Sequence, residues 1–305
     1  MSQRYFNLVV TVKRADAAEE VTTLKSFDFD AGETPENIVV LTAGTICTTL
    51  LLAGALWSST DGAERVARGD DGALAVGLAS DADDRLYVAV RSKDANVAGF
   101  WRRDTAGHWA RFAAAEPRAG LNGITFDESG TLFAADSVNG EILHLPPGQR
   151  ELKLWLDDER LKPTAPDDPV SSTGVNGLKF WNGSLYFTNT AQATVHRIDL
   201  EAGQPDEITR LHSDIPADDF AFDVSGNMYL AVHPENTVQR IAPDGAVTVL
   251  ATADDGLDGP TAIAVVREGL LVTNLGVLGT RHTPSLLRLS MRVDAPALPR
   301  PKLDG

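Results

Sequence analysis

The chain has 305 residues, of which 43% are hydrophobic and 23% are charged, values typical of a soluble globular protein and not of a disordered one. Its formal net charge is −16, with acidic residues spread along the chain, so it lacks the basic face that nucleic-acid binding requires. The single cysteine, Cys47, excludes an internal disulfide.

The N-terminus reads MSQRYFNLVVTVKRAD, and its apolar stretch is too short for the core of a signal peptide. No segment approaches the roughly 20 apolar residues of a membrane helix. We therefore expect a cytoplasmic protein with no membrane association, and we leave secretion open for a chain whose leader has been removed. The expected partner is a small-molecule substrate, and the expected assembly is a monomer or a weak homo-oligomer.

Six segments of the chain repeat the order short strand, turn, short strand, loop, strand. They begin at Thr34, Ala75, Gly120, Gly174, Ala217 and Gly259. Tight-turn sequences separate the first two strands, as at 127–130 and 223–226. The second strands are apolar, which suits strands packed between neighbouring sheets. Repeats of roughly 40 to 55 residues with four strands each predict an all-β, six-bladed β-propeller.

The last repeat supplies only three strands before a proline-rich tail at 295–305. The segment 20–29 is therefore predicted to add the fourth strand, so that the N-terminal strand closes the last blade and covers an exposed sheet edge. The predicted organisation is one propeller domain over 1–305, with an N-terminal extension at 1–19.

The innermost strand of every propeller blade lines the central channel, so the residues that open these strands are expected to meet at one channel mouth. In chain order they are Glu36, Gly77, Asn122, Asn176, Asp218 and Thr261. Carboxylate and carboxamide oxygens are the ligands that Ca²⁺ prefers. We predict a metal site formed by Glu36, Asn122, Asn176 and Asp218, with Ca²⁺ as the first choice and Zn²⁺, Mn²⁺ or Mg²⁺ as alternatives. Taken singly, an Asn-Gly pair is equally typical of a turn.

Loops after the second strands return to the same mouth and are expected to shape a substrate pocket. The predicted substrate-binding residues are Asn122, Leu51, Arg91, Asn139 and Asn274. The predicted general base is Asp218 or its neighbour Asp219, and His233 is the other candidate because it is the one histidine on a predicted mouth loop. The sequence contains no serine-nucleophile elbow and no phosphate-binding glycine loop.

Four segments carry a resemblance to a known family: PENIVV, LNGITFDESGTLFAADS, VNGLKF and DDFAFDVSGNMYLAV. They resemble the senescence-marker-protein/gluconolactonase family of six-bladed propellers, which includes luciferin-regenerating enzymes, and more distantly the paraoxonases. The resemblance extends from about Thr34 to Leu289. It implies that Glu36, Asn176 and Asp218 are metal ligands and that Asn122 lies near the metal or the substrate.

The same resemblance implies that Asp219 matches a position that also binds metal in paraoxonases. Members of the family are mostly calcium- or zinc-dependent lactonases and related ester or phosphotriester hydrolases. One departure is the apolar Val76-Gly77-Leu78 segment, where gluconolactonase-like members often place a polar, sugar-binding residue. This departure argues against specificity for sugar-acid lactones.

Together these features predict a metal-dependent hydrolase of a lactone or related ester, in which the cation polarises the carbonyl for attack by water. Two alternatives remain open. One is a biosynthetic enzyme, either strictosidine-synthase-like or a cyclase or isomerase, and the other is a non-catalytic binding propeller of the NHL-repeat kind. The ring of oxygen ligands favours metal chemistry, whereas the fold alone does not separate the three.

Overall fold

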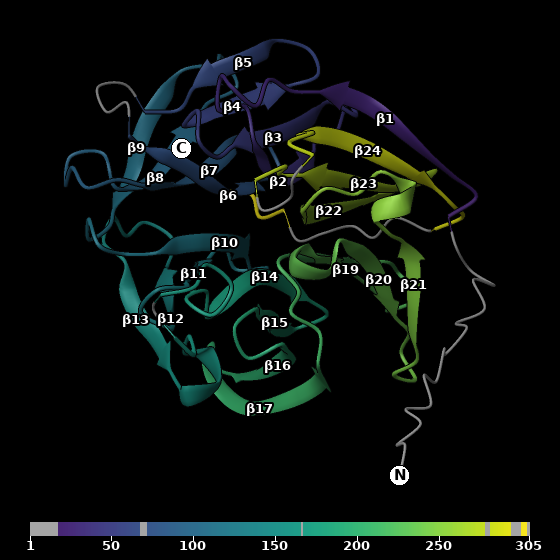
Figure 1. Ribbon diagram of the computed structural model, residues 1–305. Helices are drawn as coiled ribbons and strands as arrows, with labels where there is room; N and C mark the ends of the chain where they lie inside the picture. Colours follow the sequence, from purple (N-terminus) through teal and green to yellow (C-terminus); the bar gives the residue numbers. More distant parts are fainter. Residues whose placement is uncertain (1–17, 68–71, 166, 278–280, 294–299, 304–305) are drawn as a thin grey trace.

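The computed structural model describes residues 18–67, 72–165, 167–277, 281–293 and 300–303. Their strands form six four-stranded antiparallel sheets, arranged as blades around a central channel (Figure 1). The innermost strand of each blade contacts that of the next, and β2 also contacts β22, which closes the ring. The predicted all-β, six-bladed propeller is therefore confirmed.

The blades follow one another along the chain, each running from the channel outward. The first is β2 (Pro35–Val40), β3 (Ile46–Leu50), β4 (Ala55–Ser58) and β5 (Gly62–Arg65), and the second is β6 (Leu74–Ser80), β7 (Leu86–Arg91), β8 (Gly99–Arg103) and β9 (Trp109–Ala114). The third is β10 (Leu121–Phe126), β11 (Leu132–Asp136), β12 (Glu141–Leu145) and β13 (Lys153–Asp157), and the fourth is β14 (Val175–Trp181), β15 (Ser184–Asn189), β16 (Thr194–Glu201) and β17 (Gln204–Ser213).

The fifth blade is β18 (Phe220–Phe222), β19 (Met228–Val232), β20 (Thr237–Ile241) and β21 (Val247–Ala251). The sixth is β22 (Pro260–Val266), β23 (Gly269–Asn274), β24 (Ser285–Ser290) and β1 (Glu20–Ser26). Three short 3₁₀ turns, η1 (Glu159–Leu161), η2 (His233–Glu235) and η3 (Ala253–Asp255), complete the elements. In the part of the chain that the structure describes, no helix has the length and apolar character to cross a membrane.

Aspartates set the tight turns between inner and second strands. Oδ1 of Asp127 accepts hydrogen bonds from the backbone N–H groups of Ser129 and Thr131, both at 2.9 Å. Asp223 makes the same pair of contacts in the fifth blade. Gly130 then adopts the left-handed conformation, with φ of 89°, which a residue without Cβ reaches at little cost. The Asp-x-x-Gly pattern therefore produces a hairpin because the side chain satisfies the turn's own donors.

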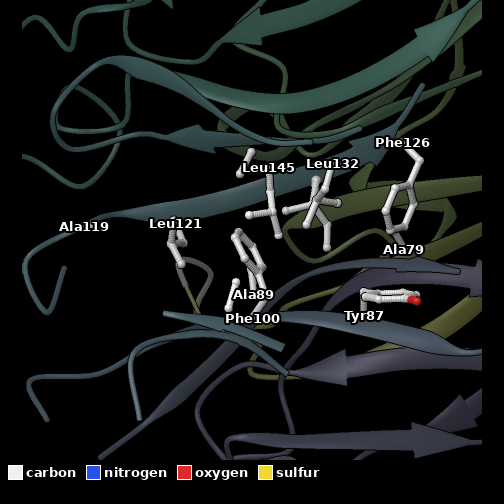
Figure 2. Close-up of a cluster of buried hydrophobic side chains, with 12 residues drawn as sticks. Ala79, Tyr87, Ala89, Phe100, Ala119, Leu121, Phe126, Leu132 and Leu145 are labelled. Atoms are coloured by element: carbon white, nitrogen blue, oxygen red, sulfur yellow. The ribbon is translucent and has the colours of Figure 1, made fainter. Parts of the chain in front are cut away.

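The core lies between neighbouring blades. Figure 2 shows one such layer, where Tyr87 and Phe100 of the second blade meet Leu121, Phe126 and Leu132 of the third. Every residue of strands β11 and β19 is buried, because each second strand packs against a blade on either side. This explains why the second strands are mainly apolar, without the alternation of a one-sided sheet.

The N-terminal strand completes the last blade, as predicted. Strand β1 pairs antiparallel with β24, so that Glu20 lies opposite Ser290 and Ser26 opposite Ser285. Residues 1–17 of the predicted extension, and all of the predicted tail except 300–303, lie outside the described residues. Residues 300–303 run along the channel end where the inner strands finish, held by hydrogen bonds from Arg300 to Asp84 and the Val40 carbonyl.

Candidate functional site

Strand pairing defines which residues of the six blades are equivalent. At the start of five inner strands the register shifts, and the first residue paired after the shift is Ile38, Leu78, Ile124, Leu178 or Ile263. Phe220 holds this position in the fifth blade. The residues two positions earlier form the mouth ring: Glu36, Val76, Asn122, Asn176, Asp218 and Thr261.

One predicted member of this ring is wrong by one residue. The second-blade member is Val76, and Gly77 belongs to the next layer down the channel. A Cβ on Gly77 would clash with the backbone oxygen of Asn122 in the neighbouring blade, so the glycine is there for close approach between blades. The other five predicted positions lie at the mouth register.

Hydroxyl groups orient the two asparagines of the ring. Nδ2 of Asn122 donates to Oγ of Ser137 at 3.1 Å, and that hydroxyl donates to the Val175 carbonyl at 2.7 Å. Nδ2 of Asn176 donates to Oγ1 of Thr190 at 2.9 Å, and this hydroxyl also donates to a backbone carbonyl. Because each hydroxyl proton is already used, its oxygen can only accept, so it must face the amide NH₂. The amide oxygens are therefore turned away from these partners.

Two carboxylates share this mouth. Burial raises the pKa of Glu36 well above its ordinary value of 4.5, and the nearby Asp218 raises it further. Burial also raises the pKa of Asp218, while the nearby His233 and Asn176 oppose that shift. Nδ1 of His233 lies 3.7 Å from Oδ2 of Asp218, beyond a direct hydrogen bond. Because burial makes it costly for both carboxyl groups to be ionised at once, a bound cation would stabilise the ionised pair.

Arg91 is the cation that the chain itself brings to this mouth. Burial lowers the pKa of Arg91, and the nearby Glu36 opposes that shift. The guanidinium donates to the backbone carbonyls of Gly120, at 3.2 Å, and Leu121, which directly precede Asn122. Arg91 therefore lies beside the ring, as predicted, and also fixes the loop that carries Asn122.

The donor set fits a hard divalent cation. Oε2 of Glu36 and Oδ1 of Asn176 are buried acceptors without a hydrogen-bond partner among the described residues. Such atoms are costly unless a cation or donor meets them. Two carboxylates with two amide oxygens suit Ca²⁺ better than Zn²⁺, which prefers nitrogen and sulfur ligands. Across the described residues, no group of three or more His, Cys, Asp and Glu side chains is placed to hold a metal, so a cation here would depend on the amide oxygens.

Asp219, predicted as an alternative base, is engaged elsewhere. Both of its carboxylate oxygens lie 2.6 Å from Nζ of Lys179, and Oδ2 also accepts from Asn37 at 3.1 Å. Asp219 has a side-chain exposure of 5% and lies one layer below the ring. Lys179, Asp219 and Asn37 come from the fourth, fifth and first blades, so they join across the channel beneath the mouth. Asp219 is therefore committed to these contacts beneath the mouth.

No protein-family model matches the chain, and no curated protein matches it in sequence. Solved structures do match. A calcium-binding protein, regucalcin, from Agrobacterium tumefaciens has 20% identity and a TM-score of 0.67 over 89% of this chain and 94% of its own. A luciferin-regenerating enzyme has 15% identity and a TM-score of 0.68 over 93% and 99%. A gluconolactonase from Xanthomonas campestris has 17% identity and a TM-score of 0.64 over 88% and 89%.

The chain shares its fold with these three propellers. The six-bladed propeller fold, which the resemblance of the four sequence segments implied, is thereby shown. At identities of 20% and below, the match establishes the architecture and leaves the activity to be argued from the site.

The remaining predicted pocket residues separate into two groups. Leu51 and His233 lie three residues after the partners of Ile38 and Phe220, which is the register position that Arg91, Ser137 and Thr190 hold in their blades.

Asn139 and Asn274 are not brought to the ring. Asn139 is exposed and its amide bonds Asp136 at 2.8 Å, while Asn274 is fully buried and its amide bonds the Gly256 carbonyl and Ser285. Ser137 and Thr190 lie on loops expected to shape the pocket, but they were not among the predicted site residues. Their signal was a hydroxyl at the same register in two successive repeats.

Proposed function

We propose that this protein hydrolyses a lactone or a related ester at the channel mouth, with a divalent cation held by Glu36, Asn122, Asn176 and Asp218. The observation that carries the proposal is a pair of buried oxygens, on Glu36 and Asn176, that have no hydrogen-bond partner in the described part of the chain and lie beside a second carboxylate. Ca²⁺ is the cation that an all-oxygen set suits best. When bound, it would supply a Lewis acid that polarises the substrate carbonyl and stabilises the oxyanion.

His233 is the proposed general base. Its Nε2 is buried near Gly259 without a hydrogen-bond partner among the described residues, so Nδ1 is the nitrogen next to Asp218. A water hydrogen-bonded to both Nδ1 and the Asp218 carboxylate would be oriented for attack, with its proton passing to Nδ1. This assignment needs the tautomer that carries its hydrogen on Nε2.

Arg91 and the neighbouring loops would bind the substrate. The Arg91 guanidinium supplies a positive edge beside Glu36, suited to the carbonyl or ring oxygen of an ester. Leu51 is half-buried, and Leu52 next to it is 45% exposed. This apolar rim favours an ester with an apolar substituent over a polyhydroxylated sugar acid.

Two variants separate binding from chemistry. Asp218→Asn should lose both calcium affinity and lactone turnover, because it replaces a charged carboxylate ligand with a neutral amide and leaves Glu36 as the one carboxylate of the proposed set. His233→Ala should keep calcium affinity and lose turnover by about 10²–10⁴-fold, the usual contribution of general base catalysis. Calorimetric calcium titration and a panel of aliphatic and sugar lactones measure the two effects. Full turnover in Asp218→Asn would end the proposal, and full turnover in His233→Ala would remove this histidine from it.

A further inference from the structure

A cavity of about 480 Å³ occupies the channel on the far side of the Lys179–Asp219 pair. All six inner strands contribute to its wall, and Arg300 of the C-terminal segment lies at its outer end. The volume falls in the range of roughly 300–1,000 Å³ that small-molecule pockets occupy. The mouth site does not include this cavity, because none of the proposed metal ligands lines it.

The wall of the cavity is mainly apolar. Aliphatic and aromatic side chains from five inner strands line it, among them Ile38, Leu78, Ile124, Phe126, Phe222 and Ile263. The polar members include Thr42 and Ser80 near the outer end and Thr125 farther in. An apolar cavity of this size gives few hydrogen bonds to water and favours an apolar guest.

The two cations of the lining are already neutralised. Nζ of Lys179 lies 2.6 Å from both carboxylate oxygens of Asp219. Nη1 of Arg300 lies 2.9 Å from Oδ1 of Asp84, and its Nη2 donates to the Val40 carbonyl. An anionic guest would therefore place an additional negative charge near Asp219. The described lining residues offer no free cation to balance that charge, and an unbalanced charge is costly in a low-dielectric space.

Lys179 still offers one donor. An ammonium has three N–H groups, and two hydrogen bonds to Asp219 leave the third available at the inner end of the cavity. A carbonyl, ether or hydroxyl oxygen would accept it without bringing charge.

We propose that the rear channel cavity binds an uncharged, mainly apolar small molecule that presents one hydrogen-bond acceptor to Lys179. This site is independent of the proposed activity, because the cross-channel contacts of Asn37, Asp219 and Lys179 separate it from the mouth. Its ligand would enter from the end of the channel where Arg300 lies.

A matched pair of fluorescent probes tests the proposal on the full chain. N-phenylnaphthylamine is neutral and apolar, and anilinonaphthalenesulfonate has nearly the same body with an added negative charge. We expect saturable fluorescence enhancement with the neutral probe and at least tenfold weaker binding of the sulfonate. Saturable binding of the sulfonate as tight as that of the neutral probe would overturn the inference, and so would the absence of saturable binding.

Variants locate the binding. Ala264→Phe places a ring in the cavity wall and should weaken the neutral probe at least tenfold. Ala110→Phe adds the same side chain on the exposed outer strand β9 and should leave the affinity unchanged. If Ala264→Phe melts below the Ala110→Phe control, Val39→Phe on β2 provides the same test. Asp218→Asn and added chelator should leave probe binding unchanged, whereas equal affinity in the cavity variants and the control would place the probe elsewhere.

Discussion

Thr190 orients a proposed metal ligand without contacting the metal, which makes Thr190→Val a sharp perturbation. The valine keeps the shape of the threonine and removes its hydroxyl. Nδ2 of Asn176 then loses an acceptor at 2.9 Å, and the Ala217 carbonyl loses a donor at 2.8 Å. Leaving buried polar groups unpaired costs about 1–3 kcal/mol of folding stability.

The same change should loosen the orientation of Oδ1 of Asn176. Loss of such an outer hydrogen bond typically weakens metal affinity by about 10–100-fold, which corresponds to about 1.4–2.7 kcal/mol of binding free energy. Calcium titration calorimetry measures this directly, and lactone turnover at subsaturating calcium should fall in parallel.

Thr194 in the same blade is a matched control. Its hydroxyl is buried and has no hydrogen-bond partner among the described residues, so Thr194→Val should leave calcium affinity unchanged and stability equal or higher. Calcium binding by Thr190→Val that is as tight as by the control would refute the proposed role of this hydroxyl.

Three further predictions concern the channel, the carboxylates and the closure of the ring. Lys179→Met should lower the free energy of unfolding in urea by about 3–5 kcal/mol because it leaves the Asp219 charge buried, and a loss below about 1 kcal/mol would show that the pair is not needed. Burial and Asp218 raise the pKa of Glu36 above 4.5. With a chelator present to keep the site free of metal, the free energy of unfolding should therefore fall as the pH rises from 4.5 through the raised pKa. Glu36→Gln should then be more stable than wild type at neutral pH and lose that advantage below pH 4.5, whereas a pH-independent difference would contradict the linkage. Deleting β1, Glu20–Ser26, should expose the edge of β24 and produce aggregates on a sizing column, and a soluble, cooperatively melting monomer would argue against closure by this strand.

The fold could be predicted from the sequence because its determinants are local and repeated. Asp127 and Asp223 each satisfy the donors of their own turn, and the same pattern returns at a nearly constant interval. The ring at Asn122 and Asn176 could be found for the same reason, since position within a repeat fixes position around the channel.

The parts that the sequence did not predict depend on contacts between blades. Val76 and Gly77 are both compatible with the start of a strand, and only the register shift decides which of them reaches the mouth. Asp219 looks like a second mouth carboxylate until Lys179, forty residues earlier in the chain, is placed on both of its oxygens. Nothing local in either segment reveals that ion pair.

The most direct test of the proposed activity is metal analysis of the protein purified without chelator, combined with lactone turnover before and after chelation. We predict one equivalent of a divalent cation, loss of turnover and of thermal stability when it is removed, and recovery of both on adding Ca²⁺. Asp218→Asn should contain no stoichiometric cation. The account would be contradicted if the purified protein contained no metal, if its thermal stability changed with neither chelator nor calcium, and if it hydrolysed no lactone. That result would favour a binding or biosynthetic propeller.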